Sequence, residues 1–384
     1  MVNRLAQAAD RVSTVELLFD LVFVFTITQV TEIVVEHPSW IGVAQAALTL
    51  AVVWWMYDAY AWLTNQAATE SVVLRVGLVA AMAAFLLLAV AIPHAFGASG
   101  LLFGFAYLAV VVIHFTLFAL LGRSGSARSM LTVAPFNLSG AVILIVAGFV
   151  TGPADWILFP VALLVMISTS FTSGPGGLDI GASHFVERHG LLMIIAFGES
   201  IVSVGVGATE HEFGPAILTG VLLCVGVVAA LWWCYFAGDD DERAGRSMTG
   251  ASVRRRSVLA LTAFGLDHYV MILGLVLWAA GVTFVSGDVF AVGPPVGAWL
   301  LAAGVGVYLL GDARYRQELA LGPSGLRYLA AVVCGATGFL GLVAAAVWQL
   351  VVLLAVLVGV IVTEAARSQR IRKSPTIPSL DPVS

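Results

Sequence analysis

The chain has 384 residues, of which 60% are hydrophobic and 11% charged, and its formal net charge is -5. Soluble domains carry about 25% charged residues, so this composition excludes a water-soluble globule and predicts a protein whose solvent is lipid. Nothing in the charge pattern suggests a nucleic-acid partner. The three cysteines, Cys224, Cys234 and Cys334, lie inside apolar runs without metal-type CxxC spacing. We interpret them as small hydrophobic side chains in helices.

Twelve apolar runs follow one another along the chain, each near the ~20 residues that a helix needs to cross hydrocarbon. They lie at 14–35, 40–63, 72–93, 99–121, 129–150, 154–172, 184–206, 213–237, 256–285, 296–311, 327–346 and 348–366. The first run contains acidic residues and lacks a small-residue cleavage site, so we interpret it as a retained helix and not a signal peptide. The sequence therefore predicts an all-α polytopic transmembrane bundle of about twelve spans. The polar tail at 367–384 is expected to be disordered.

The positive charges predict the orientation of the bundle. If the N-terminus is cytoplasmic, all 18 Lys and Arg residues lie in the inner segments or in the helical turns beside them. The inner segments are then the two termini, 64–71, 122–128, 173–183, 238–255 and 312–326. The outer loops hold acids and no positive charge, which predicts that both termini are cytoplasmic. We expect the Arg254–Arg256 run to contact anionic lipid headgroups.

Short matches between the two parts of the chain indicate an internal repeat. They pair Val15-Glu16 with Val186-Glu187, Trp54–Tyr57 with Trp232–Tyr235, and Arg75 with the Arg254–Arg256 run. Six spans separate the copies, and an even number of spans predicts a parallel repeat about an axis along the membrane normal. The alternative is that aromatic pairs and arginines are simply common at membrane interfaces. We favour two parallel six-helix halves, 1–183 and 184–366.

Two acidic residues stand near the start of the first predicted helix. Glu16 and Asp20 are four residues apart and therefore share one helix face. They can belong to a capped and hydrated helix end, where a helix N-terminus favours anions. They can equally hold a cation, or pair with Arg188 across the axis that relates the two halves.

The start of the seventh span carries a second polar group. His184 and Glu187 are three residues apart and can share a face, whereas His189 is only two residues from Glu187 and points elsewhere. This spacing does not match a helical metal motif, so we expect no metal and no cofactor. Glu187 occupies the position that corresponds to Glu16, which favours an architectural role for both.

The strongest candidate residues lie deep in the bilayer. Glu199 is about 18 Å along its helix from Glu187, at about 1.5 Å per residue, and we expect its carboxyl group to be protonated near neutral pH. Asp267 and His268 lie at a similar depth in the span at 256–285. Ionisable groups inside a membrane are functional candidates by default, so these three residues predict a proton relay or cation site. The alternative is a hydrogen-bonded cluster that only fixes helix packing.

Other polar residues inside the spans give weaker signals. His114, Asn137 and Gln349 are each more typical of an interhelical hydrogen bond than of a ligand. Tyr57 and Asp58, beside the Trp54-Trp55 pair, are interpreted as part of an aromatic belt at the inner membrane surface.

Two stretches of the sequence resemble a known family. TVELLFDLVFVFTITQVT at 14–31 and HFVERHGLLMIIAFGESIVSVG at 184–205 resemble the two signature stretches of the bacterial low temperature requirement A (LtrA) family. The resemblance implies a polytopic protein of the bacterial inner membrane, linked by name to growth in the cold, without an established biochemical activity. It supports five residues as signature positions without assigning their roles: Glu16, Asp20, His184, Glu187 and Glu199.

The leading functional prediction is a proton-coupled secondary transporter or permease for a small solute, coupled through Glu199 with Asp267 or His268. One alternative is an intramembrane enzyme that acts on a lipid or isoprenoid with carboxylates and histidines as acid–base groups or metal ligands. Another is a sensory or scaffolding membrane protein. The chain has no catalytic triad, Walker loop or dinucleotide fingerprint. The expected partners are the lipid bilayer and a small solute.

Overall fold

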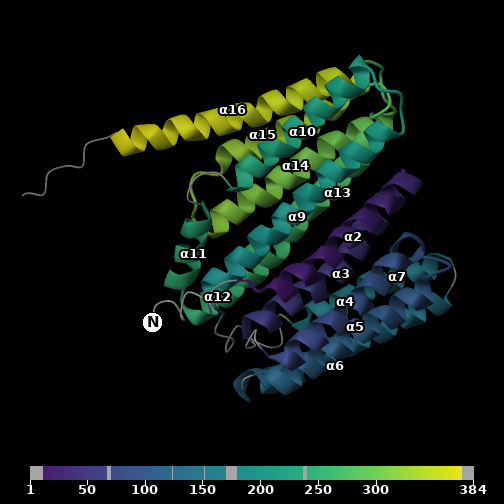
Figure 1. Ribbon diagram of the computed structural model, residues 1–384, viewed down its shortest axis with the longest axis vertical. Coiled ribbons are helices and arrows are strands. Elements are labelled where there is room, and N and C mark those ends of the chain that lie inside the picture. The colour runs from purple at the N-terminus through teal and green to yellow at the C-terminus, as the bar shows by residue number, and fades with distance from the viewer. Residues whose placement is uncertain are drawn as a thin grey trace, which may run out of the picture.

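The computed structural model describes residues 12–66, 71–122, 124–150, 152–169, 180–236 and 240–373. The regular structure throughout these ranges is helical, so the all-α prediction is confirmed (Figure 1). The first six helices are α2 (Thr14–Glu36), α3 (Trp40–Gln66), α4 (Val72–Ala91), α5 (Gly100–Leu121), α6 (Ser124–Phe149) and α7 (Pro153–Ile167). The later ones are α9 (Ala182–Thr209), α10 (Pro215–Phe236), α11 (Asp240–Gly250), α12 (Val253–Leu259), α13 (His268–Thr283), α14 (Pro295–Glu318), α15 (Gly325–Gly341) and α16 (Ala346–Lys373).

Two short irregular helices complete the fold. A 3-10 turn, η1 (Ile92–His94), follows α4, and a π-helix, η2 (Ala260–Asp267), joins α12 to α13. Within the described ranges, ten helical segments are long and apolar enough to cross a membrane, and α12, η2 and α13 form one of them. A polytopic membrane protein is therefore confirmed. The apolar helices at the sixth and eleventh predicted spans are shorter, at Trp156–Ile167 and Gly325–Gly341.

One additional helix and two longer helices are the main differences from the sequence prediction. The short helix α11 lies in a segment predicted as a loop, because its charged residues gave no apolar signal. Helix α14 continues to Glu318, well beyond the predicted end at 311. Helix α16 continues to Lys373, so 367–373 is helical and not disordered as predicted, while the rest of the predicted tail lies outside the described residues.

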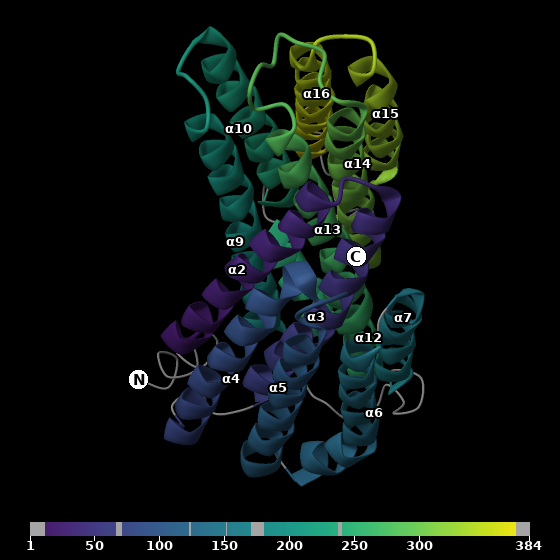
Figure 2. The same ribbon diagram turned by 90° about the vertical axis from the view of Figure 1, so that its right-hand side faces the viewer.

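The helices pack as two groups, which we call the first helix group (α2 to α7) and the second helix group (α9, α10 and α13 to α16). In the first group α2 contacts α3 and α4, α5 contacts α3, α4 and α6, and α7 contacts α3 and α6. In the second group α9 contacts α10 and α13, α14 contacts α10, α13 and α15, and α16 contacts α10 and α15. Figures 1 and 2 show the first group in purple and blue and the second in teal to yellow.

The two groups meet where α2 and α3 pack against α9 and α13. The first turns of α2 and α9 lie together, because Glu16 and Arg188 form an ion pair between them. Glu16 contacts His184 and Asp20 contacts Arg188, so the contacts advance in the same order along both helices, which run in the same direction. This seam between α2 and α9 positions the polar residues described below.

Glycines let α13 and α14 approach closely and so hold the π-helix in place. A Cβ atom on Gly304 would lie 2.5 Å from the backbone nitrogen of Trp278. A Cβ atom on Gly311 would lie 2.9 Å from the carbonyl oxygen of Asp267. Small residues at helix contacts are typical of membrane bundles, and here they fix the carboxyl end of η2 against α14.

Candidate functional site

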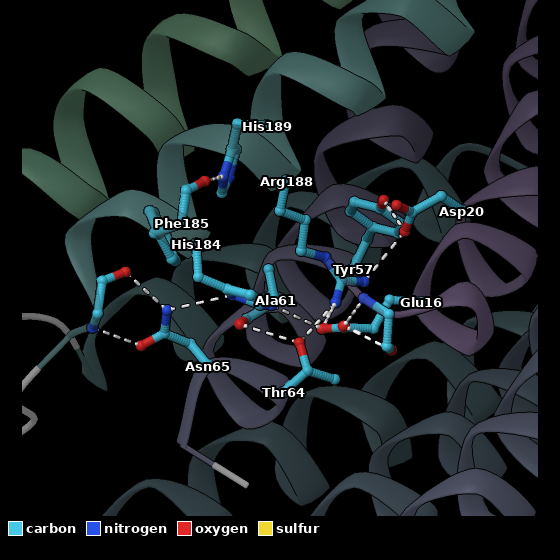
Figure 3. Close-up of polar contacts among 12 residues, drawn as sticks. Glu16, Asp20, Tyr57, Ala61, Thr64, Asn65, His184, Phe185, Arg188 and His189 are labelled. Carbon is cyan, nitrogen blue, oxygen red and sulfur yellow. Dashed lines mark hydrogen bonds and ion pairs between the residues drawn. The ribbon is translucent and has the colours of Figure 1, made fainter. Parts of the chain in front are cut away.

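A buried charge cluster joins the two helix groups. Glu16 and Asp20 on α2 are fully buried, and Arg188 on α9 is 1% exposed. Arg188 donates from Nη1 to Glu16 Oε1 at 3.0 Å and from Nη2 to Asp20 Oδ1 at 3.0 Å (Figure 3). Pairing with Arg188, one of the alternatives that the sequence left open, is therefore what the structure shows. Of the alternative of a capped and hydrated helix end, the cap is present at Ser13, whereas the complete burial of both carboxylates does not fit hydration.

The start of α2 places both acids on the seam. Ser13 is the N-cap residue. Its backbone nitrogen and its hydroxyl group both donate hydrogen bonds to Glu16 Oε2, at 2.8 Å and 2.7 Å. This capping box satisfies the first backbone donor of the helix and fixes the Glu16 side chain. Asp20 follows one turn later on the same face, where it meets the other half of the Arg188 guanidinium.

Helix α3 completes the shell around the arginine. The Thr64 hydroxyl accepts from Arg188 Nη1 at 2.5 Å, and the Tyr57 hydroxyl donates to Asp20 Oδ1 at 2.5 Å. Tyr57 is 2% exposed and Asp58 is 8% exposed. Their interpretation as an interfacial belt is therefore wrong, since both side chains face the protein interior.

His184 lies at the rim of the cluster in a defined tautomer. The Asn65 amide accepts from Gly181 nitrogen at 2.9 Å and donates to Gly181 oxygen at 2.9 Å, which fixes its orientation. Its Nδ2 group, a donor, then lies 3.4 Å from His184 Nδ1, which must be the acceptor. Nε2 of His184 then carries the ring hydrogen and lies 3.3 Å from Glu16 Oε1.

The cluster has more negative than positive charge. Two buried carboxylates face one guanidinium. Asp20 Oδ2 is buried and has no hydrogen-bond partner among the described residues. A buried carboxylate oxygen without a partner is costly, so this atom is a chemically suitable place for a proton or a monovalent cation.

Two further candidates on α9 have different surroundings. Glu187 is exposed and lies outside the cluster. Glu199 is 5% exposed, and its carboxyl group interacts with the Thr28 side chain on α2. Glu199 therefore lies on the same seam between α2 and α9, farther along α9 than Arg188.

Asp267 and His268 have partners of their own. Arg314 Nε is 2.9 Å from Asp267 Oδ1. His268 Nδ1 is 2.8 Å from the carbonyl oxygen of Ala263, and its Nε2 is 2.8 Å from the Tyr235 hydroxyl. Within the described ranges, the hydrogen bonds and ion pairs do not connect either residue to Glu199. The three predicted relay residues are therefore not joined directly.

The arginine run at the start of α12 is engaged within the protein. Arg255 Nη2 is 3.1 Å from Glu318 Oε2. Arg256 donates to four backbone carbonyl groups, those of Ile180, Met248, Thr249 and Ala251. Arg256 thus ties the end of α11 to the segment before α9, while contact of the run with lipid headgroups stays a prediction.

The three polar residues that gave weaker signals in the sequence form interhelical hydrogen bonds. His114 Nε2 is 3.1 Å from Ala59 oxygen, Trp55 donates to Asn137 Oδ1 at 2.8 Å, and Gln349 donates to Ala298 oxygen at 2.8 Å. Each contact joins two different helices, as predicted. The three cysteines are free and buried, also as predicted. In the part of the chain that the structure describes, no group of three or more His, Cys, Asp and Glu residues can hold a metal ion.

The sequence did not point to several polar residues that surround the cluster. Thr64 and Asn65 stand at the polar end of a span, where such residues are common. Tyr57, Asp58 and His189 gave a signal only as polar groups inside apolar runs. Their burial depends on which face of α3 meets α2 and α9, and hydropathy does not report that.

Comparison with known proteins gives one family. The model of the bacterial low temperature requirement A protein (LtrA) matches residues 11–362. An uncharacterized protein of Rhizobium meliloti (strain 1021) is 30% identical over 288 residues, which is 70% of this chain and 68% of that protein. The family match extends over both helix groups and includes both acids of α2 and the whole of α9.

Proposed function

The chain belongs to the bacterial low temperature requirement A family, and we propose that it is a proton-coupled secondary transporter for a small solute. One observation carries the proposal: a buried arginine on one helix group is held by two carboxylates on the other. Buried ion pairs contribute little net stability compared with apolar packing. Their position between two bodies suits a contact that is broken and re-formed during transport.

The proposed architecture has two parallel six-helix repeats. We pair the helices of the two groups in chain order, so that α2 to α7 correspond to α9, α10 and α13 to α16. Helices that contact each other in the first group then correspond to helices that contact each other in the second group. This correspondence supports the repeat. The seam departs from simple two-fold symmetry. The first group contributes α2 and α3 to it, whereas the second group contributes α9 and α13. In the proposed repeat α13 is the counterpart of α4 and not of α3.

In the membrane, the protein has twelve spans with both termini in the cytoplasm. The shorter helices α7 and α15 complete the ten long spans, and the one-sided distribution of arginines supports the orientation. The Arg188 cluster is then near the cytoplasmic ends of α2, α3 and α9. It acts as an inner gate that is closed in the structure described here.

Proton or cation binding controls this gate. Opening separates Arg188 from Glu16 and Asp20 and exposes three buried charges. An excess negative charge in the closed cluster favours uptake of a proton or cation, with Asp20 Oδ2 as its site. Glu199, which faces Thr28 on the same seam, is the second acid on the path. A coupling ion can shift such an equilibrium only through its different affinity for the two states.

The test is solute-dependent proton movement in proteoliposomes that contain a pH-sensitive dye. The probes are separate panels of amino acids, sugars, organic acids and lipophilic cations. We expect at least one panel to drive proton movement with wild-type protein and with Glu187→Gln, whose carboxylate is exposed. Glu199→Gln is expected to abolish it. Absence of any solute-dependent proton movement with the wild-type protein would contradict the transporter proposal.

A further inference from the structure

A second pair of titratable residues crosses between the helix groups. Asp58 on α3 and His189 on α9 are 8% and 1% exposed. Asp58 Oδ1 lies 3.3 Å from His189 Nε2. The pair lies one residue beyond Arg188 along α9 but is separate from the Glu16 and Asp20 contacts.

The hydrogen bonds of His189 require an additional proton in this pair. His189 Nδ1 is 2.9 Å from the carbonyl oxygen of Phe185, which only accepts, so Nδ1 carries a hydrogen. Nε2 faces a carboxylate oxygen, which also only accepts when ionised. A hydrogen must therefore lie on Nε2 or on Asp58. In either case the pair holds one proton more than a neutral imidazole with an ionised carboxylate.

The other carboxylate oxygen of Asp58 supports this assignment. Asp58 Oδ2 accepts from the indole nitrogen of Trp62 at 3.2 Å. That donor leaves Oδ1 as the atom that shares the proton with His189. The carboxyl group thus has one contact within α3 and one contact across the interface.

A neighbouring histidine provides a comparison. His268 Nδ1 faces Ala263 oxygen, and its Nε2 can accept from the Tyr235 hydroxyl, so all its contacts are met by the neutral ring. The rings of His189 and His268 are 5.2 Å apart. The two histidines therefore differ in their hydrogen-bond requirement, because Nε2 of His189 faces a carboxylate and Nε2 of His268 faces a hydroxyl group.

The groups that face His189 come from three helices. Asp58 on α3 and Asp20 on α2 are the acidic ones, and His268 on α13 is neutral. Arg188, next to His189 in sequence, has its guanidinium directed to the acids of α2. Asp58 is thus the carboxylate in direct contact with the imidazole, and it determines whether the additional proton is held.

We propose that Asp58 and His189 form a proton-binding site between the two helix groups and that this site carries the coupling proton of transport. Only the second part rests on the proposed function. Without the proton, two hydrogen-bond acceptors face each other in a buried contact. That arrangement is unfavourable, so release of the proton and separation of α3 from α9 at this point occur together.

Nuclear magnetic resonance of the protein in lipid, labelled with 15N-histidine and 13C-aspartate, tests the binding site without reference to transport. His189→Gln identifies the signals of His189 by difference. At pH 7 we expect either two protonated nitrogens on His189 or a protonated Asp58 carboxyl group. Asp58→Asn is expected to leave one bare nitrogen on His189, while His268 stays neutral in both proteins. A bare nitrogen on His189 together with an ionised Asp58 in the wild type would overturn the site.

Proteoliposomes test the coupling role. With a solute that drives proton movement in the wild type, Asp58→Asn and His189→Gln are expected to retain exchange of that solute across the membrane and to lose proton movement by at least tenfold. Proton movement at the wild-type ratio to solute would overturn the coupling role. If the wild type moves no solute while the resonance result stands, the transporter proposal fails and the proton site does not.

Discussion

At the scale of single residues, the two ends of the Arg188 guanidinium are held by carboxylates from another helix. The start of α2 carries both acids and the start of α9 carries the arginine, so the two helices bring opposite charges to the seam.

Replacement of the arginine tests this contact. Arg188→Met leaves Glu16 and Asp20 buried without a cation, so we expect a loss of about 3–5 kcal/mol of stability. The triple variant Arg188→Met/Glu16→Gln/Asp20→Asn removes all three charges and is expected to recover most of that loss. Unfolding of the purified protein in detergent measures both. The exposed Arg246 is the control, since Arg246→Met should change stability by less than about 0.5 kcal/mol.

The two acids are expected to respond differently to neutralisation. Glu16→Gln weakens both the Arg188 pair and the Ser13 cap, so it should cost about 1–3 kcal/mol. Asp20→Asn keeps an oxygen for Tyr57 and Arg188 and removes the excess charge, so it should cost less than about 1 kcal/mol. The same unfolding measurement compares them. A larger loss for Asp20→Asn than for Glu16→Gln would contradict the assignment of the excess charge to Asp20.

At the scale of elements, hydropathy predicted the spans because each one exposes apolar side chains to lipid along much of its length. It ended α14 too early, at 311, because the last turns carry Asp312, Arg314 and Arg316. These side chains are accommodated by ion pairs with Arg327, Asp267 and Asp240. The shared face of Glu16 and Asp20 could be predicted from their spacing, whereas pairing with Arg188 was one of several alternatives that the sequence left open. The orientation of α3 could not, since both of its faces are apolar.

The close approach of α13 and α14 gives a test at this scale. Gly304→Ala would place a Cβ atom 2.5 Å from the Trp278 backbone nitrogen, so the helices must separate. We expect a loss of about 1–3 kcal/mol from overpacking. Gly335 on α15 is the matched control, because a Cβ atom there has no neighbour within 4 Å. Equal stabilities of Gly304→Ala and Gly335→Ala in detergent unfolding would contradict this packing account.

At the scale of the whole molecule, the two helix groups share one seam, and buried titratable residues lie along it at several depths. The proposed orientation places the Arg188 end of the seam on the cytoplasmic side. Single cysteines at Glu212, between α9 and α10, and at Glu242, on α11, test this orientation. A membrane-impermeant thiol reagent added to intact cells should label Glu212→Cys and spare Glu242→Cys. The reverse pattern would invert the topology.

In the proposed mechanism, the charge cluster holds the cytoplasmic ends of the two helix groups together. Spin labels at the exposed positions Leu120, at the end of α5, and Glu242, on α11, report the distance between the groups in lipid nanodiscs. We predict one predominant distance in the otherwise wild-type protein. In the triple variant Arg188→Met/Glu16→Gln/Asp20→Asn we predict a clearly increased population at longer distance. Identical distance distributions in the two proteins would contradict the claim.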